Sequence, residues 1–153
     1  MTTILGIFFL ILIVNIQICY YHRELAHQQV EFSRPLRLLA KFIGWCRSST
    51  YSRHTERVYV AIHRKHHHHS DQSQDPHSPR HHPLSWFVSN RKEFLSWDEI
   101  NHYCKNCEFK DQDFDEFLER NPYGPYVSFV LLFLIFGYIG IILWFVFLRG
   151  YLL

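Results

Sequence analysis

The sequence predicts an all-α integral membrane protein, in which two transmembrane helices flank a cytosolic, largely helical segment rich in histidine. Three observations predict this fold class. The runs 4–21 and 127–148 contain no charged residue. All 14 Asp and Glu residues, and all Lys and Arg residues except Arg149, lie between those runs. All 12 histidines lie there as well, and histidine is the commonest metal ligand among side chains.

The composition excludes several classes of protein. Hydrophobic residues make up 48% and aromatic residues 18% of the 153 residues, which excludes a disordered or collagen-like chain. A formal net charge of +2 argues against binding to nucleic acid. The four cysteines lack the spacing of a secreted disulfide framework, and the single pair Cys104-x-x-Cys107 is a weak signal for zinc or redox chemistry.

The first apolar run predicts a membrane-spanning helix over 4–21. As a helix its apolar part is about 26 Å long, close to the ~30 Å of bilayer hydrocarbon. The preceding Met-Thr-Thr has no basic residue and no small-residue cleavage site follows, so a signal peptide is the weaker interpretation.

The second apolar run predicts another spanning helix over 127–148, about 33 Å long. The run is uncharged for too long to favour a buried helix of a soluble protein. Basic residues gather just after the first run and just before the second. By the positive-inside rule, the segment 22–126 is therefore expected in the cytoplasm and both termini on the other face. These basic residues are Arg23, Arg34, Arg37, Lys41, Lys110 and Arg120.

The middle segment contains a third amphipathic stretch. Residues 35–45 predict a helix lying in the membrane interface, with Arg37 and Lys41 facing away from its apolar side. A helix packed on a cytosolic domain is the alternative. The apolar side would carry Leu36, Leu39, Phe42 and Ile43.

Two further parts of the middle segment have a local signal. Residues 70–83 contain Pro, Ser, Asp and Gln and predict a loop. Residues 105–120 are acidic and aromatic and predict a surface helix packed through Phe114, Phe117 and Leu118.

A first histidine pair, His22 and His27, follows the first apolar run directly. Five residues correspond to about 140° around an α-helix, so the two rings would not share one narrow face. They can both line a site wide enough for two metal ions, or the helix can end between them.

A second histidine group lies about forty residues further on. His63, His66 and His67 are at i, i+3 and i+4, within about 100° of one another on a helix. His68 and His69 then point elsewhere. The two groups together predict a metal site with five imidazole ligands, which suit iron, zinc, copper or nickel. These ligands are His22, His27, His63, His66 and His67.

The two groups resemble the first two histidine boxes of the membrane fatty acid desaturases, of the acyl-CoA desaturase type. The matching stretches are His22-Arg23-x-x-x-His27, His63-Arg64-x-His66-His67 and Asp75-Pro76-His77. The resemblance is specific over about 15–82, and bacterial members are similar there. The third box of that family, a His-x-x-His-His, is missing, since no histidine follows His102. The resemblance thus covers the N-terminal portion of the family, and residues 1–153 are expected to form a single incomplete desaturase domain.

The resemblance implies a di-iron centre, completed by ligands absent from this chain. It implies oxygen-dependent introduction of a double bond into a saturated acyl chain carried by acyl-CoA or a lipid. It also implies a haem or iron–sulfur electron-donor protein, and histidine boxes facing the cytoplasm from a bacterial inner membrane. The alternatives are a non-enzymatic membrane metal-binding protein and an inactive remnant.

Other residues have expected roles around such a centre. Asp75 and His77 are expected to orient the rings of ligating histidines by contacting the ring nitrogen that does not bind the metal. Arg64 and Lys65 are expected to meet acyl-CoA phosphate or lipid headgroups, with plain solvation as the alternative. Trp45 is a candidate for the wall of the acyl tunnel, and core packing is the alternative.

Overall fold

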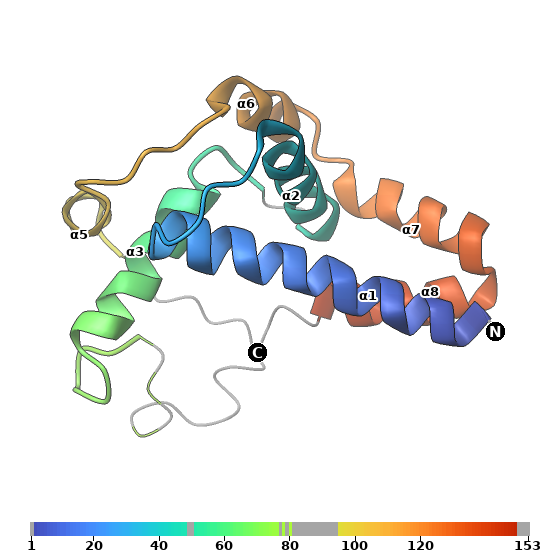
Figure 1. The fold of residues 1–153 in the computed structure, drawn as a ribbon, viewed down its shortest axis with the longest axis horizontal. Coiled ribbons are helices and arrows are strands. Elements are labelled where there is room, and N and C mark those ends of the chain that lie inside the picture. The colour runs from blue at the N-terminus through green and yellow to red at the C-terminus, as the bar shows by residue number, and fades with distance from the viewer. Residues whose placement is uncertain (1, 49–50, 77, 79, 81–94, 150–153) are drawn as a thin grey trace.

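The computed structural model describes residues 2–48, 51–76, 78, 80 and 95–149, and within them it is all-helical (Figure 1). The longest element is α1, Thr2–Ile18, which continues without interruption into a π-helix, η1, Cys19–Ala26. The helices that follow are α2 Arg34–Arg47, α3 Thr55–His68, α5 Trp97–Tyr103, α6 Gln112–Arg120, α7 Gly124–Phe136 and α8 Tyr138–Arg149.

The first apolar run forms the helix that the sequence predicts. Its segment Ile4–Ala26 is long and apolar enough to cross a membrane, and it is the one such helix among the described residues. Its apolar side chains are mostly exposed, with Ile4 at 74% and Phe8 at 66%.

The second apolar run forms two helices in place of one, so the predicted second spanning helix over 127–148 is not confirmed. The chain reverses at Gly137, whose φ of 60° and ψ of −137° are open to glycine but not to residues with a Cβ. α7 and α8 are about 20 Å and 18 Å long, well short of the ~30 Å hydrocarbon core. The two helices fold into a hairpin beside the first half of α1 (Figure 1).

Small residues allow the hairpin to pack closely. A Cβ on Gly140 would lie 2.0 Å from the carbonyl oxygen of Leu132, so α8 contacts the backbone of α7 directly. The indole Nε1 of Trp144 donates to the carbonyl oxygen of Pro125 at 2.9 Å. This bond joins the second half of α8 to the first turn of α7.

α2 forms where the sequence predicts a helix, with Pro35 in its first turn. Its charged side is the buried one: Lys41 is 0% exposed and Arg37 7%, whereas Leu36 and Leu39 are exposed. The two basic side chains thus face away from the apolar side as expected, but they point into the protein.

α6 is shorter than predicted and begins at Gln112. Leu118 is buried and Phe114 packs beside it, as expected. Phe117 is 59% exposed, so its predicted packing role is wrong. Residues 70–76 form no helix, in agreement with the predicted loop, and most of the remainder of that loop lies outside the described residues.

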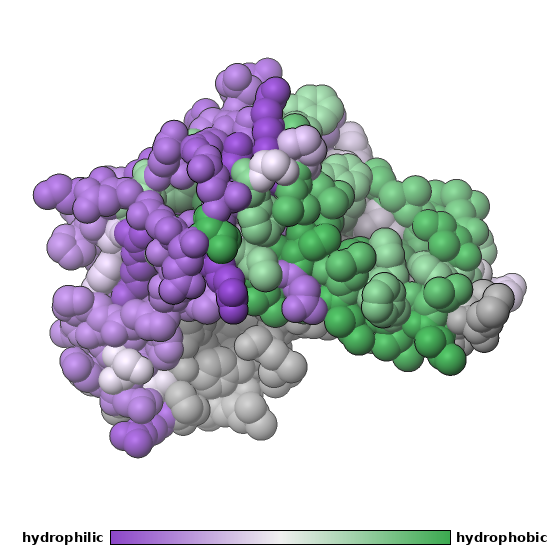
Figure 2. All heavy atoms as spheres, in the orientation of Figure 1, coloured by the Kyte–Doolittle hydropathy of each residue, from purple (hydrophilic) through white to green (hydrophobic). Residues whose placement is uncertain are grey.

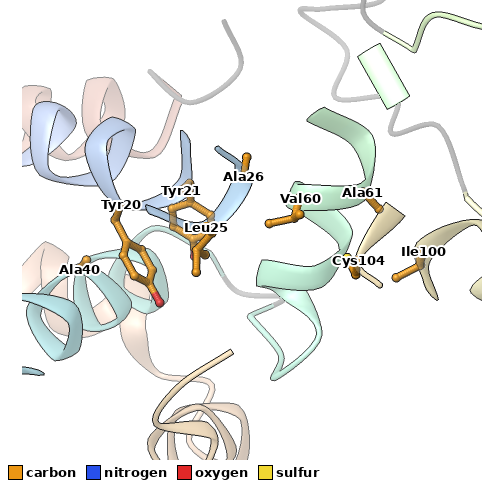
Figure 3. Packing of buried hydrophobic residues seen from close by; sticks show 9 residues of the cluster. All are labelled: Tyr20, Tyr21, Leu25, Ala26, Ala40, Val60, Ala61, Ile100 and Cys104. Atoms are coloured by element: carbon orange, nitrogen blue, oxygen red, sulfur yellow. The ribbon is translucent and has the colours of Figure 1, made fainter. Parts of the chain in front are cut away.

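Two hydrophobic clusters hold the helices together. The first lies between η1, α2, α3 and α5 (Figure 3) and consists of Tyr20, Tyr21, Leu25, Ala26, Ala40, Val60, Ala61, Ile100 and Cys104. The second lies between α2, α6 and the segment before α3 and consists of Ile43, Trp45, Cys46, Tyr51 and Leu118. Because η1 and α3 share the first cluster, their histidines are brought side by side.

Candidate metal centre

The π-helical geometry of η1 brings the first histidine pair together. The backbone N–H of His27 donates to the carbonyl oxygen of His22 at 3.0 Å, an i to i+5 bond. This bond closes a wider turn than that of an α-helix, so residues five apart lie one above the other. The two Nε2 atoms are 3.0 Å apart. After His27 the backbone turns away, because Gln28 adopts a φ of 54°.

α3 supplies the second pair from one face of an ordinary α-helix. The Nε2 atoms of His63 and His67, at i and i+4, are 3.0 Å apart. Across the gap between the helices, the Nε2 atoms of His63 and His27 are 3.1 Å apart. The ring of Tyr59 stacks on that of His63, with an interplanar angle of 5° and a centroid distance of 5.8 Å, which fixes its orientation.

The structure thus brings four of the five predicted ligands into one group. One donor atom from each of His22, His27, His63 and His67 lies within 4.8 Å of all the others. In a tetrahedral site with metal–nitrogen bonds of about 2.0–2.1 Å, neighbouring nitrogens lie about 3.3 Å apart. The three observed Nε2–Nε2 distances of 3.0 to 3.1 Å are close to that value.

The chemistry of the four rings fits a bound cation. Nε2 of His27 and of His63 each faces two other Nε2 atoms. A neutral ring nitrogen either donates or accepts, so it cannot make complementary hydrogen bonds to both neighbours at once. Lone pairs therefore converge, and a metal ion at their centre would accept them all.

The electrostatics favour neutral rings. Desolvation, together with the neighbouring histidines His22, His67 and His27, lowers the pKa of His63 to about 3. Desolvation, together with the neighbouring His22, His67 and Arg64, also lowers the pKa of His27. Because a metal binds the neutral imidazole, these rings are held in the form that can ligate at neutral pH.

His66 lies outside the group of four. Its Nδ1 is 2.7 Å from Oδ1 of the buried Asp75, and Oδ2 of that carboxylate accepts from the backbone N–H of Asp71 at 2.8 Å. Asp75 therefore contacts a predicted ligand, as expected. That ligand is His66, which is not one of the four converging histidines. His68 and His69 also lie outside the group. His77, the other residue expected behind the ligands, lies outside the described residues.

The residues expected to bind substrate make contacts within the protein. Arg64 donates to the carbonyl oxygens of Ala26 and Tyr103, at 2.9 and 3.0 Å, and thereby joins the ends of η1 and α5. Lys65 pairs with Glu99 at 3.3 Å. Trp45 is 7% exposed, belongs to the second hydrophobic cluster and donates to the carbonyl oxygen of Asn121, in line with the packing alternative.

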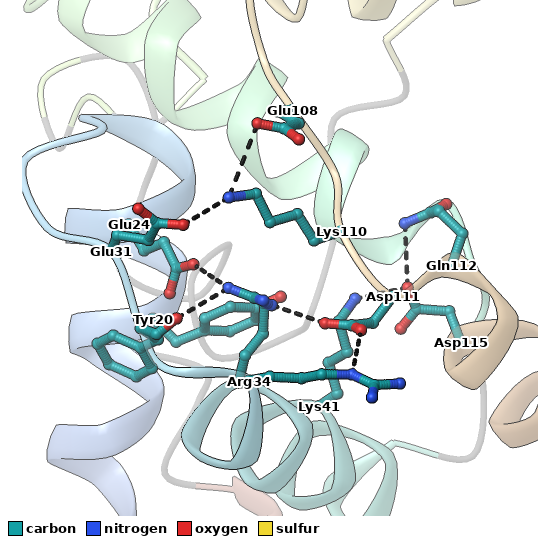
Figure 4. Close-up of polar contacts among 12 residues, drawn as sticks. Tyr20, Glu24, Glu31, Arg34, Lys41, Glu108, Lys110, Asp111, Gln112 and Asp115 are labelled. Carbon is teal, nitrogen blue, oxygen red and sulfur yellow. Dashed lines mark hydrogen bonds and ion pairs between the residues drawn. The ribbon is translucent and has the colours of Figure 1, made fainter.

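Polar contacts around α2 are a feature that the sequence did not reveal (Figure 4). Arg37 donates to Asp111 at 2.7 Å and to Glu24 at 3.1 Å, which connects α2 with η1 and the start of α6. Glu24 lies between the first two histidines in the chain, so this network anchors the helix that carries them. The one available signal was the pair of basic residues, Arg37 and Lys41, on a largely apolar helix.

Comparisons with known proteins leave the site to be interpreted from its own geometry. No family model, no curated protein and no solved structure matches the chain.

Proposed function

We propose that the protein is a membrane-anchored iron protein of the fatty acid desaturase type, acting in oxygen-dependent desaturation of a saturated acyl chain. The observation that carries the proposal is the convergence of four imidazole nitrogens, two from each histidine group, at the end of a helix apolar enough to cross a membrane. Neither group alone offers more than two of these ligands.

The donor set supports a first-row transition metal. Imidazole nitrogen suits zinc, copper, nickel and iron, and the resemblance of the two histidine groups to desaturase boxes selects iron among them. Bound iron would supply the activation of oxygen, and the four histidines would hold it. A second iron would use His66, whose ring lies beside the group of four, together with ligands outside residues 1–153.

The distribution of apolar surface supports an acyl substrate. The exposed face of α1, α7 and α8 is hydrophobic, and the part formed by α3 and α5 is hydrophilic (Figure 2). His22 lies in η1, which directly continues α1, so the histidine group lies where the hydrophobic half ends. An acyl chain held in lipid can reach a metal there without entering water. We place this end at the cytoplasmic face of a bacterial inner membrane, with an electron-donor protein docking from the cytoplasm.

Metal content tests the site. The parent protein and its variants are purified in detergent and loaded with ferrous ion in the absence of oxygen. His63→Ala is expected to bind much less iron than the parent, because the ring of His63 contacts two other ligands. The matched control His69→Ala, outside the group, is expected to keep its iron. Iron content by mass spectrometry and X-ray absorption provide the readout. Equal loss in both variants would show that the histidine run chelates metal nonspecifically.

Activity requires a separate test. Co-expression with a polypeptide that carries a His-x-x-His-His box is expected to yield unsaturated acyl chains, detected by gas chromatography, and His63→Ala is expected to abolish them. Absence of such products with iron bound in the site would contradict the desaturase function and leave the metal site intact.

A non-enzymatic metal-binding role is the second candidate. One compact group of four nitrogen ligands has the ligand number of a closed zinc site. One tightly bound zinc per chain, with no iron uptake when both metals are offered, would favour this function over the first.

A further inference from the structure

Cys104 and Cys107 form a pair of neighbouring thiols at the end of α5, which the proposed function does not use. Both cysteines are free. The backbone N–H of Cys107 donates to the carbonyl oxygen of Cys104 at 3.0 Å, which closes the turn between them. The two side chains are close enough for the Cys104 thiol to donate to a Cys107 thiolate. The pair therefore has the proximity that an intrachain disulfide needs.

The two thiols differ in access. Cys104 is 5% exposed and belongs to the first hydrophobic cluster, where it lies near Ile100 and Ala61 (Figure 3). Cys107 is only partly buried. A reagent from solution can thus reach Cys107 more easily than Cys104.

Two arginines of α3 give the pair a positive surrounding. Arg57 and Arg64 both act on the two sulfurs electrostatically. Arg57 also stacks over the ring of Phe109, at 5.6 Å from its centroid. Its Nη2 donates to Oδ1 of Asn101 at 3.0 Å, and its buried Nε has no hydrogen-bond partner within the described residues.

The hydrogen bonding makes the two thiols unequal. The single S–H proton of Cys104 can be donated to the carbonyl oxygen of Arg57, at 3.3 Å, or to the thiolate of Cys107. The donation from Cys104, with the charges of Arg64 and Arg57, lowers the pKa of Cys107 to about 7, although burial opposes the shift. The same hydrogen bond and burial raise the pKa of Cys104. The accessible cysteine is therefore the one that ionises first.

We propose that Cys104 and Cys107 form a redox-active dithiol that reduces low-molecular-weight disulfides by thiol–disulfide exchange. The Cys107 thiolate attacks one sulfur of the disulfide and releases one thiol. The Cys104 thiol loses its proton, attacks the Cys107 sulfur and releases the second thiol. Two protein thiols are oxidised to one intrachain disulfide, and one disulfide is reduced to two thiols.

The surroundings argue against a metal site at this pair. Among the described residues, the only group of three or more histidine, cysteine or carboxylate side chains close enough to share an ion is the four-histidine group. The two thiols therefore have no third ligand there. The inference is independent of the proposed iron chemistry, because it uses no residue of the histidine group.

Trapping with oxidised glutathione tests the proposal. The full chain in detergent, with Cys19→Ser and Cys46→Ser to leave only the pair, is treated at pH 7, alkylated and analysed by mass spectrometry. The intact pair is expected to form the intrachain disulfide and retain no glutathione. Cys104→Ser is expected to retain one glutathione on Cys107. Cys107→Ser is expected to react at least tenfold more slowly.

Three results of the glutathione experiment would overturn the proposal. They are glutathione retained on Cys107 of the intact pair, two thiols left free, and equal rates for Cys104→Ser and Cys107→Ser. Cys104→Ala is a second variant with an apolar side chain at the buried position, and circular dichroism checks that each variant keeps its helices. If both thiols are protected from alkylation and a chelator abolishes that protection, the pair binds a metal. That result also overturns the proposal.

Discussion

At the scale of single residues, Lys41 shows how the fold handles buried charge. Its Nζ lies 2.7 Å from Oε1 of Glu56 and 2.6 Å from Oδ2 of Asp115, and all three side chains are at most 1% exposed. Tyr20 donates to Glu56 and Tyr51 to Asp115, so the carboxylates have further partners. With one ammonium and two carboxylates, the group carries an excess negative charge away from water, which is unfavourable.

That excess charge predicts a pH-dependent effect of Glu56→Gln. Burial raises the pKa of Glu56 to about 6, above its ordinary value of 4.5. The ionised form therefore destabilises the folded state fully above pH 6, and this cost is lost as the pH falls to 4.5. Glu56→Gln should stabilise the protein by about 1–2 kcal/mol at pH 7.5 and by nearly nothing at pH 4.5.

The measurement is thermal or denaturant unfolding in detergent, compared between the two proteins at each pH, so that contributions from the histidines cancel. Lys41→Met is the contrasting variant. It leaves two buried carboxylates without a cation, and a loss of about 3–5 kcal/mol is expected. A constant difference between Glu56→Gln and the parent across the pH range would contradict the buried-charge argument.

At the scale of helices, the sequence predicted what depends on local pattern. Amphipathic spacing predicted α2, and the i, i+4 spacing of His63 and His67 placed both on one face of α3. The π-helix was missed because its hydrogen bonding leaves no periodic trace in eight residues, so His22 and His27 were expected about 140° apart. His66 lies outside the group of four with its Nδ1 against Asp75, and the sequence does not show which histidine ring Asp75 contacts.

Other misses have long-range or steric causes. The ion pairs of Lys41 join residues 15 and 74 positions away, and no local pattern reveals such contacts. The reversal at Gly137 was missed because an apolar run containing glycine is also compatible with a continuous helix. Hydrophobicity reports that the run avoids water, but it does not report whether the backbone turns back on itself.

The close packing of the hairpin predicts a large effect of Gly140→Leu. Any Cβ at this position would overlap the carbonyl group of Leu132, which belongs to the backbone and cannot rotate away. Separating α7 from α8 should cost at least about 1–3 kcal/mol, the range for overpacking a filled interface. Ile142→Leu, at a 65% exposed position of the same helix, is the matched control and should change little. The midpoint of thermal unfolding in detergent gives the comparison, and equal midpoints would contradict the packing.

At the scale of the whole molecule, the hairpin of α7 and α8 determines the membrane topology that we expect for the chain. The ring of Phe136, next to the reversal, packs against that of Phe9 near the start of α1, at a centroid distance of 6.2 Å. Trp144 of α8 bonds back to Pro125 at the start of α7. The hairpin thus enters the apolar half from the side of the histidine group, approaches the beginning of α1 and returns.

This path predicts that the two ends of the described chain lie on opposite faces of the membrane. The beginning of α1 should lie on the face away from the histidine group, and the end of α8 on the same face as that group. This differs from the expectation that both termini share the far face, which followed from a second spanning helix. It also places Arg149 with the other basic residues, in better agreement with the positive-inside rule.

Labelling single cysteines in sealed, oriented membrane vesicles tests this topology. In a background with all four native cysteines replaced by serine, a membrane-impermeant maleimide should label Arg149→Cys from the same side as Gln29→Cys. It should label Thr3→Cys from the opposite side. The reason is that α1 with η1 is long and apolar enough to cross the bilayer once, whereas α7 and α8 are each too short to cross and turn back at Gly137. Labelling of Arg149→Cys together with Thr3→Cys would show that residues 127–148 straighten into a second spanning helix in the bilayer.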